Sequence, residues 1–207
     1  MVSGLKTLHS NMDTYRDIAG FTDEEVCKAI AAETRRIMDF WKKHSVGWAP
    51  AEVSEILTRS MLDWQSSLAE SLETWLGREP DGALILAWVN LGSLVEGLLK
   101  LFLCVYYKDY AKDNAPYRDK KGKLRDPDGQ ELEALRTFME KTVWSPEEKS
   151  DWGPWILKIQ RRRNTIHAYK ERKLGSFEEW RADLRIYLIF IRTINGRLPY
   201  PEYDYHD

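Results

Sequence analysis

The sequence has few cysteines and little uncompensated charge, and each shortage excludes a class of protein. Only two cysteines, Cys27 and Cys104, occur in 207 residues, and both fall inside apolar helical patterns. They predict small buried thiols and exclude a disulfide framework or a cysteine-based zinc site. The formal net charge is −2 and the sequence pI is about 6.1. These values exclude a protein that coats nucleic acid by bulk attraction, but they are compatible with a local basic patch.

Targeting signals are also missing. The first nine residues contain no basic segment followed by a long apolar stretch, so we expect no secretory signal and a cytoplasmic location. The most apolar stretch, residues 84–105, is nearly long enough to span a bilayer, but polar side chains interrupt it at Asn90, Ser93, Glu96 and Lys100. The pattern therefore predicts a central buried helix and no membrane association.

Helical periodicity and aromatic residues are what the sequence has in abundance. Hydrophobic residues recur at helical spacing almost throughout, and no segment alternates with period two, which predicts an all-α bundle of about six to seven helices. The chain contains nine Trp, ten Tyr and six Phe. Four tryptophans stand at helical spacing among aliphatic residues, so we expect core or dimer packing rather than base stacking; they are Trp64, Trp75, Trp88 and Trp180.

Capping residues and helix breakers place the predicted helices. Thr22 to Glu25 and Ser145 to Glu148 are typical of helix N-termini, and Gly153-Pro154 is expected to break or kink the helix that follows the second of these. The segment 109–130 indicates a long mobile loop, whose lysines and arginines could also close over an RNA strand. The predicted helices span about 23–43, 50–76, 83–107, 131–142, 145–173 and 177–194.

Basic side chains concentrate between Lys158 and Lys173, opposed by a single glutamate. On a helix, Arg162 interrupts an apolar stripe, whereas Arg163 and His167 lie on a neighbouring stripe within reach of Asn164. Arginine binds phosphate through a planar fork of donors, and imidazole exchanges a proton near neutral pH. The run therefore predicts a phosphate-binding site that contains a titratable group.

The residues Arg162, His167 and Tyr169, spaced as Arg, four residues, His, one residue, Tyr, resemble the signature of the HEPN superfamily, the higher eukaryote and prokaryote nucleotide-binding domains. With this resemblance, the chain is expected to be a single domain, residues 1–207, with a HEPN-like core at about 83–196 and the N-terminal helices, 22–76, packed on it. The resemblance implies an all-α fold and a metal-independent endoribonuclease. It also implies a homodimer with the active site at the interface and, for members with the Tyr, a toxin that has an antitoxin partner.

In that family the catalytic arginine is commonly followed by a polar residue such as asparagine. Here Asn164 follows Arg163, so both Arg162 and Arg163 are candidates for the role. The resemblance implies that His167 acts as general base or acid on a ribose 2'-hydroxyl, while an arginine stabilises charge on the phosphate oxygens. This reaction needs no metal or cofactor and requires RNA, because DNA lacks the internal nucleophile. A two-fold dimer would supply a second His167.

Glu96 stands among leucines, where an ionised carboxylate requires a partner. Two partners are expected from the sequence: the guanidinium of Arg162 or Arg163, or Lys100 one helical turn away. Two alternatives to the nuclease also stay open. One is a HEPN-like module that binds a nucleotide, RNA or a protein without cutting it. The other is a structural bundle whose basic residues offset the negative end of a helix dipole.

Overall fold

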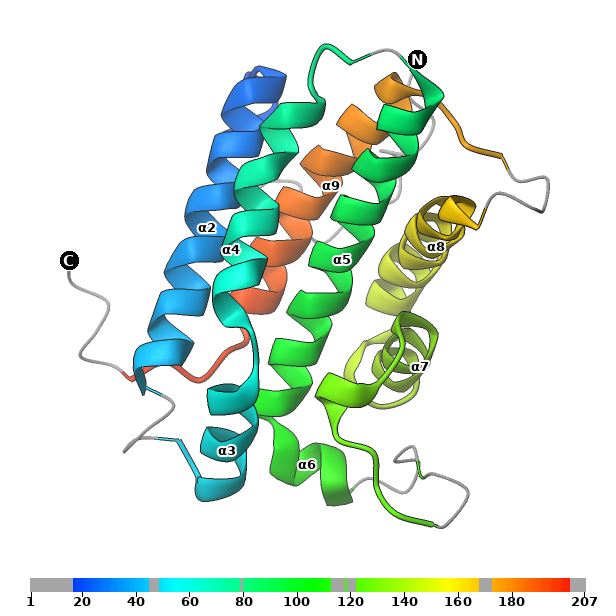
Figure 1. Ribbon diagram of the computed structural model, residues 1–207. Coiled ribbons are helices and arrows are strands. Elements are labelled where there is room, and N and C mark those ends of the chain that lie inside the picture. Colours follow the sequence, from blue (N-terminus) through cyan, green and yellow to red (C-terminus); the bar gives the residue numbers. More distant parts are fainter. Residues whose placement is uncertain are drawn as a thin grey trace.

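The computed structural model describes residues 17–44, 49–78, 80–112, 118, 122–167 and 173–201. These residues are helical and contain no β-strand beyond an isolated bridge between Arg118 and Leu124, which confirms the all-α prediction. Four helices form a closed arrangement in which two opposite members each pack against the other two (Figure 1). In this arrangement α2 (Asp23–His44) and α5 (Asp81–Val105) both contact α4 (Leu62–Glu70) and α9 (Phe177–Asn195).

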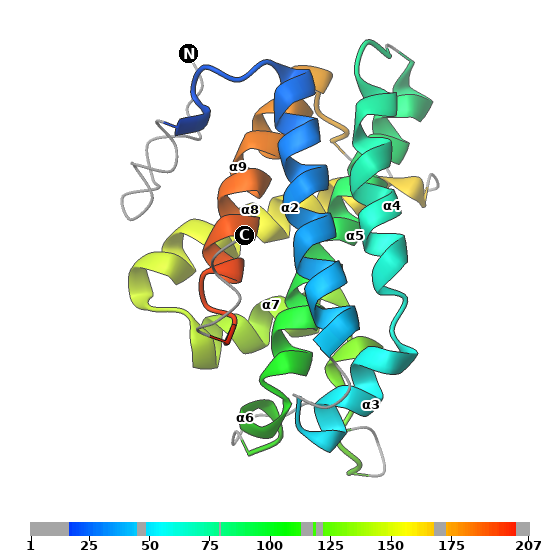
Figure 2. The same ribbon diagram turned by 90° about the vertical axis from the view of Figure 1, so that its left-hand side faces the viewer.

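The remaining elements surround one side and one end of this arrangement. Figure 2 shows α8 running across the direction of the four helices, where it packs on α5. The other helices are α3 (Ala51–Arg59), α6 (Tyr107–Lys112), α7 (Leu132–Phe138) and α8 (Pro146–Arg163). Short helical turns are η2 (Ser71–Trp75), η3 (Pro127–Gly129), the π-helical η4 (Met139–Val143) and η5 (Asn164–Ile166).

Helix α5 is the centre of the hydrophobic core. Its leucines and valines, such as Leu94 and Val95, are fully buried between α4, α8 and α9. By length and composition it is the one helix among the described residues that could cross a membrane, and 56% of the relevant window is buried inside the fold. The burial agrees with the central helix predicted from the sequence.

Both predicted N-caps are present. The Thr22 backbone N–H donates to Glu25 Oε2 at 2.7 Å, and the Glu25 N–H donates to Thr22 Oγ1 at 3.2 Å. Ser145 and Glu148 form the same reciprocal pair at the start of α8. These caps satisfy amide groups that have no partner within the helix, so they fix where α2 and α8 begin.

The prediction of one continuous helix over 50–76 is wrong. The chain leaves the helical conformation at Ser60, which is extended, and α4 begins at Leu62. Ser60 Oγ donates to the Ile56 carbonyl at 2.8 Å and so provides a partner for one of the last carbonyl groups of α3. Because neither glycine nor proline marks this break, the periodic pattern alone could not reveal it.

The helix that carries the basic run also differs from its prediction. It continues through Pro154, which is exposed, so the missing N–H removes one hydrogen bond without breaking the helix. It ends at Arg163 rather than near Lys173, and the chain tightens into η5. Thr165 Oγ1 donates to the Arg162 carbonyl at 2.6 Å, which satisfies an acceptor at the helix end.

The predicted mobile loop, residues 109–130, is shorter than expected within its described part. Helix α6 continues to Lys112, and the end of the segment is anchored to the core. Tyr110 Oη donates to the Arg125 carbonyl at 2.7 Å, and Arg59 donates to Asp126 at 2.7 Å. Residues 113–117 and 119–121 lie outside the described residues.

The tryptophan predictions hold for most positions. Trp88 and Trp180 are fully buried and Trp75 is partly buried, whereas Trp64 is 66% exposed. A core position for Trp64 is therefore wrong for the single chain.

The two thiols are buried and free as predicted, and burial raises the pKa of Cys27 and of Cys104 to about 12.

Candidate functional site at the end of helix α8

Three successive arginines end α8 and reach in different directions. Consecutive residues on an α-helix are rotated by about 100° about the axis, so neighbouring side chains cannot share one face. Arg163 reaches α5, Arg162 reaches the start of α9, and Arg161 is exposed. The fold therefore separates the two arginines that the sequence could not distinguish.

Arg163 packs closely on α5 because Gly92 leaves room for it. A Cβ atom at Gly92 would lie 2.6 Å from Arg163 Cδ, which is closer than real atoms approach. Arg163 Nη1 donates to Glu96 Oε2 at 2.5 Å, and Lys100 Nζ donates to Glu96 Oε1 at 2.8 Å. Both partners expected for Glu96 are thus present at the same time.

The Glu96 carboxylate stays ionised at neutral pH. Burial is the largest influence on its pKa and raises it, but hydrogen bonds from Lys100 and Arg163 together outweigh burial. The pKa of Glu96 therefore lies below its ordinary value. The three side chains are 19–26% exposed, so solvent screens this cluster only in part.

Arg162 joins the end of α8 to the start of α9. Its Nη1 donates to the Lys173 carbonyl, and its Nη2 donates to Glu179 Oε2 at 2.8 Å. Its Cζ atom lies 5.9 Å from the ring centroid of Trp88, within the range of a cation–π contact. Gly175 has a φ of +81°, and a Cβ atom there would collide with the Glu179 carboxylate, so glycine is required at this turn.

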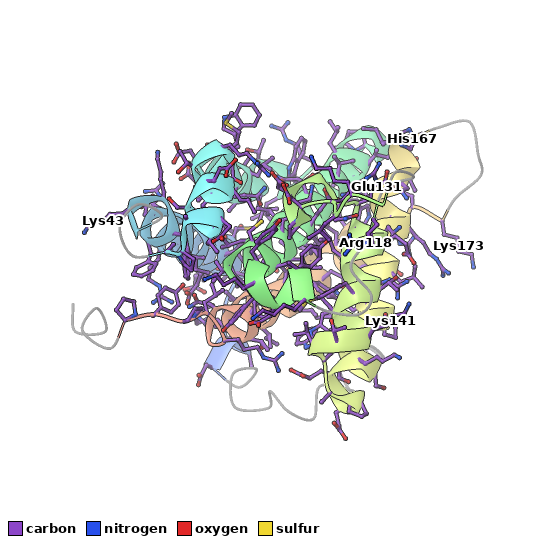
Figure 3. The ribbon with its side chains drawn as sticks, turned by 90° about the horizontal axis from the view of Figure 1, so that it is seen from below. Lys43, Arg118, Glu131, Lys141, His167 and Lys173 are labelled. Atoms are coloured by element: carbon purple, nitrogen blue, oxygen red, sulfur yellow. The ribbon has the colours of Figure 1, made fainter. Side chains whose placement is uncertain are left out.

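His167 lies just beyond η5 and is exposed, at the edge of the molecule in Figure 3. Because α8 ends at Arg163, the shared helical face predicted for Arg163 and His167 does not form. Within the described residues, no hydrogen bond or ion pair joins the imidazole to either guanidinium. Asn164 continues the chain in η5, where its carbonyl accepts from the His167 N–H at 3.3 Å, and Tyr169 lies outside the described residues.

An open pocket of about 470 Å³ lies beside the C-terminal half of α8. The described residues that line it are four basic residues and one proline: Lys158, Arg161, Arg162, Lys173 and Pro154. The four basic residues belong to the run between Lys158 and Lys173 that the sequence shows, whereas the pocket itself was not predicted. Pro154, Lys158 and Arg161 are spaced by four and three residues, and this spacing was the signal that they share a face.

A buried carboxylate of α9 holds one of the pocket lysines. Asp183 is fully buried, and its Oδ1 accepts from Lys158 Nζ at 2.6 Å and from Trp155 Nε1 at 3.1 Å. Burial raises the pKa of Asp183 and outweighs these two contacts, which lower it. Lys158 itself stays 43% exposed toward the pocket.

The arrangement can bind an anion. Arginine and lysine donors converge on one opening, and arginine forms paired hydrogen bonds with phosphate or carboxylate oxygens. The imidazole of His167 is exposed just beyond η5, outside the residues that line the pocket. No protein-family model matches this chain, and neither a curated protein nor a solved structure does.

Proposed function

We propose that the protein is a metal-independent endoribonuclease of the HEPN type, acting as a toxin or as a defence or stress ribonuclease. The observation that carries the proposal is an exposed imidazole, His167, which lies one short turn beyond the arginine-rich end of α8, a helix with an open basic pocket beside it. An RNA strand can reach this imidazole from solvent. The basic side chains attract the strand through its phosphates.

In the proposed reaction, His167 removes the proton from a ribose 2'-hydroxyl, and the 2'-oxygen attacks the adjacent phosphorus. The bond from phosphorus to the 5'-oxygen of the next nucleotide breaks, which leaves a 2',3'-cyclic phosphate and a 5'-hydroxyl. Arg162 is the better candidate to stabilise the phosphate charge, because it lines the pocket while Arg163 packs on α5. Glu96 then keeps Arg163 in place beside the site.

The cleavage test uses mixed RNA in EDTA. We expect products with a 2',3'-cyclic phosphate, and a loss of at least about 100-fold in rate for His167→Ala, because general acid–base catalysis contributes on that order. The matched control is His9→Ala, which removes an imidazole elsewhere in the sequence. RNA that stays intact at high protein concentration would overturn the proposal, as would equal rates for the two variants.

A second His167 from a two-fold dimer would act as the general acid that protonates the leaving 5'-oxygen. Sedimentation equilibrium tests this part separately. A dimer is expected at the concentrations at which RNA is cleaved. A strictly monomeric and active protein would remove the shared cleft from the mechanism.

The second candidate is a non-catalytic HEPN-like module that binds RNA, a nucleotide or a protein. One observation favours it: Arg162 and Arg163 are each paired with a carboxylate of the same chain. Such ion pairs hold the two arginines in place, as a binding surface requires. They also leave less unneutralised positive charge to stabilise a transition state. Under this reading His167→Ala leaves RNA affinity nearly unchanged and no cleavage is seen with either protein.

A further inference from the structure

The pocket beside α8 has more positive charge than its own contacts neutralise. Among the described residues, four that line the pocket are basic and none is acidic. Two of the four are paired with carboxylates of α9, through the contacts of Lys158 and Arg162 described above. Arg161 and Lys173 are exposed and have no carboxylate partner within the described part of the chain. The surplus is therefore two positive charges.

The pocket is also built to hold its cations in place. The Arg162 guanidinium is fixed by the Lys173 carbonyl and by Glu179, and Lys158 is fixed by the buried Asp183. A ligand therefore meets two donors that are already ordered, those of Arg162 and Lys158, beside the exposed side chains of Arg161 and Lys173. Ordering two of the four donors in advance lowers the entropy cost of binding. The volume of about 470 Å³ lies in the usual range for small-molecule sites, and Pro154 gives the pocket an apolar wall.

We propose that this pocket binds the terminal phosphate of an RNA strand. A phosphate monoester carries roughly −1.5 to −2 charges at neutral pH, whereas an internal phosphodiester carries one, so the surplus of the pocket matches a strand end better than an internal linkage. The Arg161 fork and the Lys173 ammonium contact the phosphate oxygens, and the sugar lies against Pro154. The proposal rests on the proposed function for the identity of the strand, but its binding chemistry is independent of cleavage.

The test measures binding in the His167→Ala protein, so that RNA is not consumed. Fluorescence anisotropy compares one short RNA with a 5'-phosphate, with a 3'-phosphate and with hydroxyls at both ends. We expect about 10-fold tighter binding for one of the phosphorylated forms, since charge-assisted hydrogen bonds contribute on that scale. Equal affinity for all three RNAs would overturn the proposal.

Two double variants remove the same charge from different places. Arg161→Gln with Lys173→Gln is expected to abolish the preference for the phosphorylated end. Lys43→Gln with Lys141→Gln is the control, because both lysines are exposed and neither lines the pocket. Figure 3 shows Lys43 on the opposite side of the molecule from Lys173. The control should weaken binding of all RNAs equally. Loss of the end preference in the control variant, or its survival in the pocket variant, would contradict the assignment.

Competition with mononucleotides separates the sources of the phosphate. If adenosine 5'-monophosphate competes only weakly with the phosphorylated RNA, the result supports binding of a strand end. If it competes with the same affinity as a short RNA, the result overturns the strand-end proposal and assigns the pocket to a free nucleotide. The two proposals can fail separately. A preference for the phosphorylated end in a protein that cuts no RNA would support the pocket assignment and overturn the proposed nuclease activity. Cleavage of RNA without an end preference would support the nuclease activity and overturn the pocket assignment.

Discussion

At the scale of single residues, the contact between Gly92 and Arg163 sets how closely α8 approaches α5. The arginine stem, and not only its flexible end, occupies the space where a Cβ atom at Gly92 would stand. A side chain at this position would have to displace Arg163 and with it the hydrogen bond to Glu96. The glycine is therefore part of the candidate site, although it has no chemical group of its own.

Replacing Gly92 with alanine is expected to destabilise the protein by about 1 kcal/mol, because a steric cost of roughly 1–3 kcal/mol exceeds the gain in helix propensity. The control is Gly82→Ala in the first turn of the same helix, where nothing lies within 4 Å of an added Cβ atom. That change should be neutral or slightly stabilising. Urea denaturation of both variants measures the difference, and equal stability of the two would contradict the packing argument.

Glu96 makes stability depend on pH. Its pKa is lowered in the folded protein, so its contribution is fully present above the unfolded pKa, near the ordinary 4.5, and is lost as the pH falls through the lower folded value. Glu96→Gln should cost roughly 1–3 kcal/mol at pH 7, because two cations lose a charged acceptor. The difference from the unmodified protein should shrink as the pH falls below 4.5.

Unfolding free energies measured from pH 7 to pH 3 test this expectation. Glu55→Gln serves as the control, since Glu55 is 78% exposed and lies 3.9 Å from Arg59. Exposed pairs of this kind contribute little to stability. A Glu96→Gln difference that stays constant across the pH range would show that the lost stability comes from packing and not from charge.

At the scale of whole elements, α8 is defined at its beginning by local sequence and at its end by contacts with other helices. Ser145 Oγ accepts from the Glu148 N–H at 3.3 Å, and the Ser145 N–H donates to Glu148 Oε2 at 3.0 Å. The other end of α8 is held by the contacts of Arg162 and Arg163 with α9 and α5. The helix that presents the basic pocket is therefore supported at both ends.

Ser145→Ala should cost about 1 kcal/mol, the usual effect of removing a side-chain N-cap. The matched control is Ser54→Ala inside α3, a helix interior where alanine is the better residue. Thermal unfolding followed by circular dichroism measures both changes. If the two serines behave alike, the cap does not determine where α8 begins.

The same contrast explains which parts of the fold were predictable. Helix starts at Thr22 and Ser145 follow from residues three positions apart, so the sequence alone reveals them. The break at Ser60 and the end of α8 at Arg163 are marked by neither glycine nor proline, so a periodic pattern does not reveal them. Helix ends of this kind require knowledge of the tertiary contacts.

The candidate site was predictable in composition but not in arrangement. The residue types at Arg162, Arg163 and His167 indicated phosphate chemistry, and Glu96 indicated a need for a partner. The directions of the arginines depend on the faces that α5 and α9 present to α8. The support of Lys158 by the buried Asp183 joins residues 25 positions apart, and no local pattern indicates it.

At the scale of the whole molecule, the last helix of the four closes on the first. Arg185 Nη1 donates to Asp23 Oδ1 at 2.6 Å, and Arg192 Nε donates to Glu33 Oε1 at 3.3 Å. The first of these contacts joins residues 162 positions apart in the chain. The apolar sides of α2 and α5 that face α9 are covered only when α9 is in place.

This closure has a consequence during synthesis. A ribosome delivers α2, α4 and α5 before α9, so the nascent chain carries an uncovered apolar surface until α9 has emerged. Contacts between such distant residues form late, because the intervening chain must first lose its conformational freedom. The growing polypeptide is therefore expected to depend on chaperone protection until α9 leaves the exit tunnel.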